Sequence, residues 1–146
     1  MRGPNFLLLL ILVFLGACAD PRYVDGTEGF IDGVRGQCAL EFKREALCLE
    51  IQWTELPRES TYGKMLLTFV DRTDPSRRVD PLATPHVLLW MPSMGHGSAP
   101  VKLERLDVGT FLASEIFFIM PGPWDIRYQL KDGSNVIEEQ IQKVTI

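Results

Sequence analysis

A short segment in the second half of the chain carries side chains that could bind a metal ion. Residues 90–97 read Trp-Met-Pro-Ser-Met-Gly-His-Gly, with thioethers at Met91 and Met94 and an imidazole at His96. Pro92 and the two glycines oppose regular structure and permit a tight loop that turns the three side chains toward one point. Thioether and imidazole donors suit soft metals, and the segment lacks the carboxylates that Ca²⁺ or Mg²⁺ prefer. The pattern therefore indicates a Cu(I) site.

A metal-free interpretation of the same segment stays open. Methionine is an unbranched and adaptable side chain, so Met91 and Met94 could instead fill the open end of a hydrophobic core. In that case His96 simply faces water.

An enzyme is not expected from this sequence. The chain has two histidines, and a hydrolytic arrangement would have to combine His96 with Ser93 or Ser98. These serines lie too close to His96 in sequence for a good nucleophile and base geometry, and the loop offers no carboxylate to orient the imidazole.

The elements that must hold this loop are predicted to be strands. Apolar and polar residues alternate most clearly from Trp124 to Leu130, and no segment after residue 36 sustains a helical period. Short apolar runs recur at intervals of about ten residues, which is typical of an immunoglobulin-like β-sandwich of about seven strands. The predicted strands cover residues 47–53, 64–70, 86–91, 101–107, 111–120, 124–130 and 136–146.

Strand parity adds a fourth candidate ligand. If the strands from His86 onward run alternately up and down, the loops that follow Met91 and Met120 emerge at the same end of the sandwich. Met120 is followed by proline, as Met91 is, and could join the metal site. Filling of the core is again the alternative for Met120.

The start of the chain predicts an export signal. Arg2 precedes an apolar run from Phe6 to Leu15 that is too short to span a bilayer. The run ends in Leu-Gly-Ala-Cys at 15–18, which resembles the lipobox of bacterial lipoproteins. That resemblance implies a signal peptide over residues 1–17, a lipid anchor on Cys18 and, with Ala19 after it, the periplasmic face of the outer membrane. An ordinary secretory signal is the alternative.

Residues 18–36 and 37–146 are predicted to form a flexible tether and a single domain. The tether region contains four glycines, a proline and several charges without a period. The whole chain of 146 residues has 46% hydrophobic residues, 23% charged residues and a formal net charge of -4. Its cations are scattered, so nucleic acid is not an expected partner.

Cys38 and Cys48 follow the export signal and are predicted to form a disulfide. The strand around Cys48 places Leu47 and Leu49 on one face and Cys48 on the other, whereas Cys38 has the parity of Leu40. A pair on one face therefore requires a bulge or an irregular segment over residues 38–46.

The second half of the chain resembles a known family. Residues 64–146 are similar to the YtkA-like domain, which is related to the FixH family, through WMPxMGHG at 90–97, GTF at 109–111 and IMPGxWDI at 119–126. Domains of this kind are small secreted or membrane-anchored β-sandwiches, and FixH-like members are linked to cation transport and to assembly of copper-containing respiratory oxidases. The resemblance implies an immunoglobulin-like fold and suggests copper ligands at Met91, Met94, His96 and Met120.

Two functions are therefore expected. The first is an envelope-anchored lipoprotein that binds Cu(I) for metal handling or oxidase maturation. The alternative is a metal-free module whose methionine-rich and tryptophan-rich end docks a protein partner at the cell envelope.

Overall fold

The computed structural model of the protein describes residues 38, 40–58 and 61–146. The predicted signal peptide, the predicted lipid attachment at Cys18 and the predicted tether lie outside these residues, so their assignment stays a prediction. A search of the described residues finds no helix with the length and apolar character needed to span a membrane.

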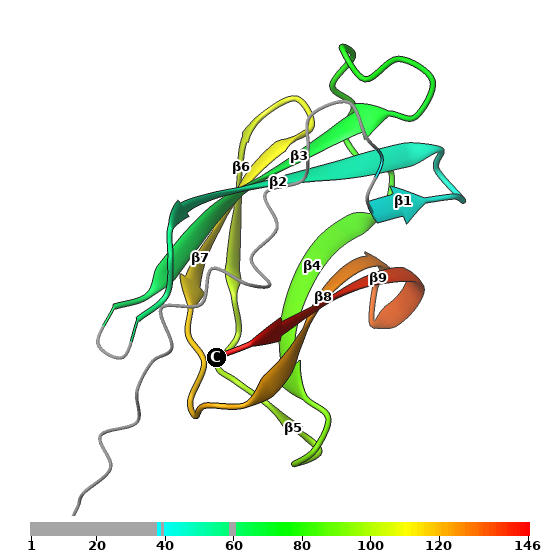
Figure 1. Cartoon of the computed structure of the whole chain (residues 1–146). Coiled ribbons are helices and arrows are strands. Elements are labelled where there is room, and N and C mark those ends of the chain that lie inside the picture. Colours follow the sequence, from blue (N-terminus) through cyan, green and yellow to red (C-terminus); the bar gives the residue numbers. More distant parts are fainter. Residues whose placement is uncertain (1–37, 39, 59–60) are drawn as a thin grey trace, which may run out of the picture.

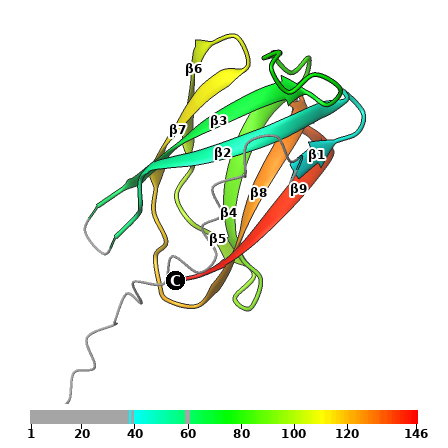
Figure 2. The same ribbon diagram turned by 45° about the horizontal axis from the view of Figure 1, so that its top comes forward.

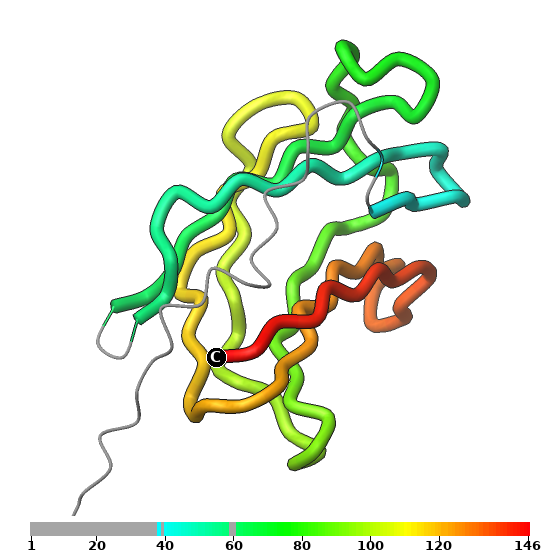
Figure 3. The backbone as a smooth tube through the Cα atoms, in the orientation of Figure 1, coloured from blue at the N-terminus to red at the C-terminus, as the bar shows by residue number. Residues whose placement is uncertain are grey.

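Two antiparallel sheets face each other (Figure 1). The first sheet has the strand order β1-β2-β3-β7-β6, with β1 (Leu40–Phe42), β2 (Leu47–Glu55), β3 (Gly63–Asp71), β7 (Thr110–Ile116) and β6 (Lys102–Asp107). The second sheet has the order β5-β4-β8-β9, with β5 (His96–Gly97), β4 (Thr84–Met91), β8 (Pro123–Asp132) and β9 (Asn135–Thr145). The backbone trace separates these two layers (Figure 3). The predicted all-β sandwich is confirmed.

The longer strands follow the immunoglobulin order. Without the three-residue β1 and the two-residue β5, the sheets read β2-β3-β7-β6 and β4-β8-β9. In chain order this is the A-B-E-D and C-F-G arrangement of a constant-type immunoglobulin domain. The expected seven-strand framework is therefore present, with one short strand added beside β2 and another beside β4.

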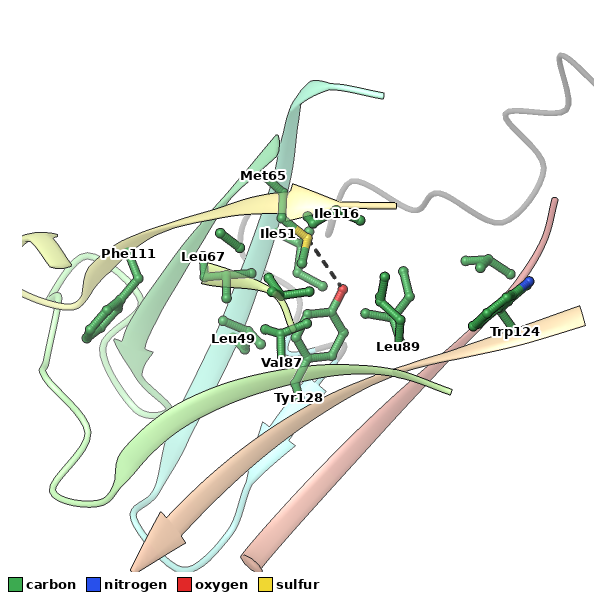
Figure 4. Close-up of a cluster of buried hydrophobic side chains, with 14 of the residues drawn as sticks. Leu49, Ile51, Met65, Leu67, Val87, Leu89, Phe111, Ile116, Trp124 and Tyr128 are labelled. Atoms are coloured by element: carbon green, nitrogen blue, oxygen red, sulfur yellow. Dashed lines mark hydrogen bonds between the residues drawn. The ribbon is translucent and has the colours of Figure 1, made fainter. Parts of the chain in front are cut away.

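Alternation along the strands places the core between the sheets. Met65, Leu67 and Phe69 point inward from β3, and each is at most 2% exposed. The equally buried inward positions of β8 are Trp124, Ile126, Tyr128 and Leu130. Burial of each such side chain contributes about 1.5–3 kcal/mol. Figure 4 shows Met65, Leu67 and Tyr128 meeting between the layers, with Trp124 at one end of the cluster.

The predicted disulfide between Cys38 and Cys48 is present, with 5.2 Å between the Cα atoms. Strands β1 and β2 pair so that Leu40 opposes Leu49 and Glu41 opposes Cys48. Cys38 precedes the first residue of β1, so the alternation of that strand does not fix the direction of its side chain. This irregular start resolves the parity conflict in the sequence.

The strand predicted over residues 111–120 is shorter in the structure. Strand β7 ends at Ile116, because the chain leaves the first sheet there to reach β8 in the second. Glu115 has a φ of 60°, a left-handed conformation that is uncommon outside glycine and turns the chain near the end of the strand. Met120 consequently lies in the connecting loop of residues 117–122.

Candidate functional site

A hairpin formed by β4 and β5 brings Met91 and His96 together. The two residues are direct partners in the antiparallel register. The carbonyl of Met91 accepts hydrogen bonds from the backbone N–H groups of Met94 at 3.2 Å and Gly95 at 3.0 Å, which closes the turn. Directly opposed residues point to the same face of a sheet with Cβ atoms about 4.5–5.5 Å apart. The side chains of Met91 and His96 therefore start from neighbouring positions on one face of the sheet.

The loop after Met120 lies against this pair. Met91 is 4% exposed, and a Cβ built on Gly122 would lie 2.7 Å from its terminal methyl carbon. Gly122 has a φ of 133°, which side chains rarely allow. The two loops that follow Met91 and Met120 thus meet at one end of the sandwich, as strand parity predicted.

Trp124 joins the two loops. Its indole N–H donates a hydrogen bond to the carbonyl of Met120 at 3.0 Å. Its ring centroid lies 6.5 Å from that of His96 and 5.4 Å from that of Phe118, both in edge-to-face arrangements. Trp124 is 1% exposed and cannot move without disturbing these contacts. Sequence reasoning placed Trp124 on the inward face of its strand and in the motif at 119–126, but neither pattern indicated its contacts with His96 and Met120.

His96 can present one ring nitrogen to a ligand. The side chain is half-buried, and its Nδ1 lies 3.2 Å from the carbonyl oxygen of Gly97. A proton on Nδ1 would satisfy this contact and leave the lone pair of Nε2 for a metal ion.

The structure separates the predicted donors into two groups. Met91 and His96 are paired, and the backbone carbonyl of the half-buried Met120 accepts a hydrogen bond from Trp124, whose ring contacts His96. Met94 instead lies at the hairpin tip and is 59% exposed. Met91 and Met120 also pack against the core, so the core-filling interpretation describes part of what they do.

A metal at this place would depend on methionine sulfur. Within residues 38, 40–58 and 61–146, no three His, Cys, Asp or Glu side chains gather closely enough to hold an ion. The soft-donor residues at this end of the sandwich, Met91, Met120 and His96, would supply thioethers and one imidazole, a set that fits Cu(I) and would be poor for Ca²⁺, Mg²⁺ or a structural zinc.

Comparison of the chain with known proteins gives no match to a family, to a curated protein or to a solved structure.

Proposed function

We propose that the protein is an envelope-anchored lipoprotein that binds Cu(I) at the Trp124 end of its sandwich and serves copper handling or oxidase maturation. Met91 and His96 would be the principal donors, Met120 a third, and Met94 an auxiliary donor from the flexible side chain at the hairpin tip. The resemblance to YtkA-like and FixH-related domains belongs to this proposal.

The observation that carries the proposal is the cross-strand pair of Met91 and His96 beside the loop that Trp124 holds. Soft donors fixed on rigid strands bind an ion without a large ordering cost. The indole of Trp124 next to His96 could add a cation–π attraction for a bound monovalent ion. No carboxylate from the adjacent loop competes for the copper ion, because residues 92–101 contain no Asp or Glu.

The envelope location rests on the sequence and the disulfide. The lipobox-like residues 15–18 would place a lipid anchor on Cys18. A disulfide between Cys38 and Cys48 suits the oxidising environment outside the cytoplasm. The periplasmic face of the outer membrane is accordingly the proposed site.

Titration of the protein with Cu(I) against a competing chelator tests the metal site. His96→Ala and Met91→Leu should each weaken Cu(I) binding at least about tenfold, which corresponds to about 1.4 kcal/mol. Met91→Leu retains an apolar side chain of similar size, so its effect on folding should be small. Met120→Leu and Met94→Leu should have smaller effects, in that order.

His86→Ala provides the matched control. His86 lies on the outer face of β4, where its Nδ1 is 3.1 Å from Gln129 Oε1, and should not contribute to copper binding. If His96→Ala binds Cu(I) as tightly as His86→Ala does, the proposed site is wrong.

A metal-free interaction module is the second candidate. It is favoured by the exposure of apolar side chains at the same end, including Met94 at 59% and Tyr62 at 56%. In that case Met94→Leu and His96→Ala would impair binding of an envelope protein while the metal content of the wild type stayed at background.

A further inference from the structure

The tip of the hairpin between β4 and β5 holds an exposed methionine. Met94 is 59% exposed, and all four tip residues, 92–95, are exposed. The other methionines of the described residues are buried or half-buried: Met65 at 0%, Met91 at 4% and Met120. Figure 2 shows the hairpin at the lower end of the molecule, where the loop between β7 and β8 also lies. An accessible thioether therefore stands at the outer end of the hairpin that carries Met91.

The turn keeps Met94 close to Met91 without burying it. The backbone N–H groups of Met94 and Gly95 donate hydrogen bonds to the Met91 carbonyl, at 3.2 and 3.0 Å. A turn closed from its first to its fourth residue holds those two Cα atoms within about 7 Å of each other. A Cβ built on Gly95 would meet nothing within 4 Å, so the space around this part of the tip is open. Because methionine has three rotatable side-chain bonds, the Met94 thioether can turn toward Met91 or toward solvent.

The inner donors are shielded from a second molecule. Met91 is 4% exposed, and the backbone of Gly122 lies so close that an added Cβ would be 2.7 Å from the Met91 methyl carbon. His96 is half-buried, and its ring centroid is 6.5 Å from that of Trp124. An ion held by Met91 and His96 would therefore be covered on the side of the loop 117–122. Exchange of that ion needs a donor on the open side of the hairpin.

We propose that Met94 is the donor through which Cu(I) enters and leaves the site, and that it sets the rate of exchange and not the affinity. This inference rests on the proposed copper function. On entry, Met94 would take the ion from a carrier that holds Cu(I) through sulfur or imidazole ligands, and Met91 and His96 would then replace the remaining carrier ligands. Release follows the same steps in reverse. Each step forms one bond between copper and a soft donor and breaks another, the ion stays Cu(I), and no electron or proton is transferred.

Stopped-flow measurements without oxygen test this role on the full chain. Release is followed by mixing the Cu(I)-loaded protein with excess bicinchoninate, and loading by mixing the copper-free protein with the Cu(I)–bicinchoninate complex. Met94→Leu should slow both reactions at least about fivefold, because the same step is lost in each direction. The Kd for Cu(I) is the ratio of the two rates and should change by less than about twofold. Leucine is similar in size and lacks the sulfur atom, so the fold should be unaffected.

Two further variants separate an exchange donor from a permanent ligand. Met120→Leu removes a proposed inner donor and should speed release and weaken binding while loading stays nearly unchanged. Met94→His restores a soft donor at the hairpin tip and should recover most of the exchange rate that Met94→Leu loses.

The result that overturns the inference alone is a Met94→Leu variant that binds Cu(I) and exchanges it as fast as the wild type. Faster release in Met94→Leu with a proportional loss of affinity also overturns it, because Met94 would then be an ordinary ligand. A wild type that binds no Cu(I) overturns the proposed function and this inference together. The equilibrium titration shows that outcome before any rate is measured.

Discussion

At the scale of single residues, Gly122 determines whether the two loops of the candidate site can meet. Its backbone has a φ of 133°, and an added Cβ would be 2.7 Å from the Met91 methyl carbon. Gly122 also exchanges two backbone hydrogen bonds with Ile146, at 2.8 and 3.0 Å, which fix the end of the chain beside the site. A side chain at this position must therefore displace Met91 or strain the backbone.

Gly122→Ala should lower the free energy of unfolding by about 1–3 kcal/mol more than Gly133→Ala does. Gly133 also has a positive φ, but its value of 58° lies in the left-handed region that alanine can enter, and a Cβ there would meet nothing within 4 Å. The difference between the two variants therefore measures the greater backbone strain and the Met91 contact at Gly122 together. Urea denaturation gives both values. Equal losses in the two variants would show that neither the backbone at Gly122 nor its contact with Met91 resists a side chain there.

Asp71 gives a pH-dependent contribution to stability. Its Oδ1 accepts hydrogen bonds from the Thr73 hydroxyl at 2.6 Å, from the Thr73 N–H at 2.7 Å and from the Asp74 N–H at 3.1 Å. These hydrogen bonds, with that of the Thr73 hydroxyl the largest cause, lower the pKa of Asp71 from 3.8 to about 2. Since the folded pKa is below the unfolded one, the stabilisation is complete above pH 3.8 and is lost as the pH falls toward 2.

Asp71→Asn should therefore be less stable than the wild type at pH 7, and the gap should close between pH 3.8 and about 2. Denaturant midpoints of the wild type and the variant, measured across this pH range, report the difference in stability. A difference that persists unchanged to pH 2 would contradict the role assigned to the ionised carboxylate.

At the scale of elements, the disulfide fastens the start of the sandwich to β2. Replacing Cys38 and Cys48 together by serine should reduce the free energy of unfolding by about 2–3 kcal/mol, because a closed loop of this length restricts the unfolded chain. The bridge lies at the start of β2 and not in the loops beside Trp124, so Cu(I) affinity should not change. Thermal unfolding with and without reductant measures the effect. Equal melting temperatures would show that the disulfide does not stabilise the folded protein.

Sequence patterns predicted the strands well where the two faces of a strand differ. The alternation in β8 identified its buried face correctly. Trp124, Ile126 and Tyr128 are buried in the core, whereas Arg127 lies on the opposite face of the strand. The same reasoning failed over residues 117–120. Phe118 is 2% exposed within a loop that packs against the core, and an apolar loop of this kind cannot be told from a strand by composition.

The candidate site was predicted in part. Strand order was enough to bring the loops after Met91 and Met120 to one end, because antiparallel neighbours reverse direction at each connection. The position of Met94 could not be predicted from the sequence, because it depends on how the four residues between Met91 and His96 turn. The hydrogen bond from Trp124 to Met120 also depends on tertiary packing.

At the scale of the whole molecule, the sandwich has two unlike ends. One end brings thioethers, aromatic rings and a histidine together on the loops 92–98 and 117–122, and the exposed ion pairs of Lys64 with Glu55 and of Lys102 with Glu115 lie on the strand ends beside these loops. The other end carries ion pairs such as Arg105 with Asp80 and Arg72 with Glu41. The proposed copper site therefore lies on loops that themselves contain no charged residue, at one end of the sandwich.

X-ray absorption at the copper edge of the Cu(I)-loaded protein tests directly whether Met91 and His96 bind the ion. We expect a Cu(I) ion with sulfur neighbours and one imidazole nitrogen, with a sulfur lost in Met91→Leu and the nitrogen lost in His96→Ala. A spectrum that is the same in the wild type and both variants, or that shows only oxygen and nitrogen neighbours, would contradict a copper site made by Met91 and His96.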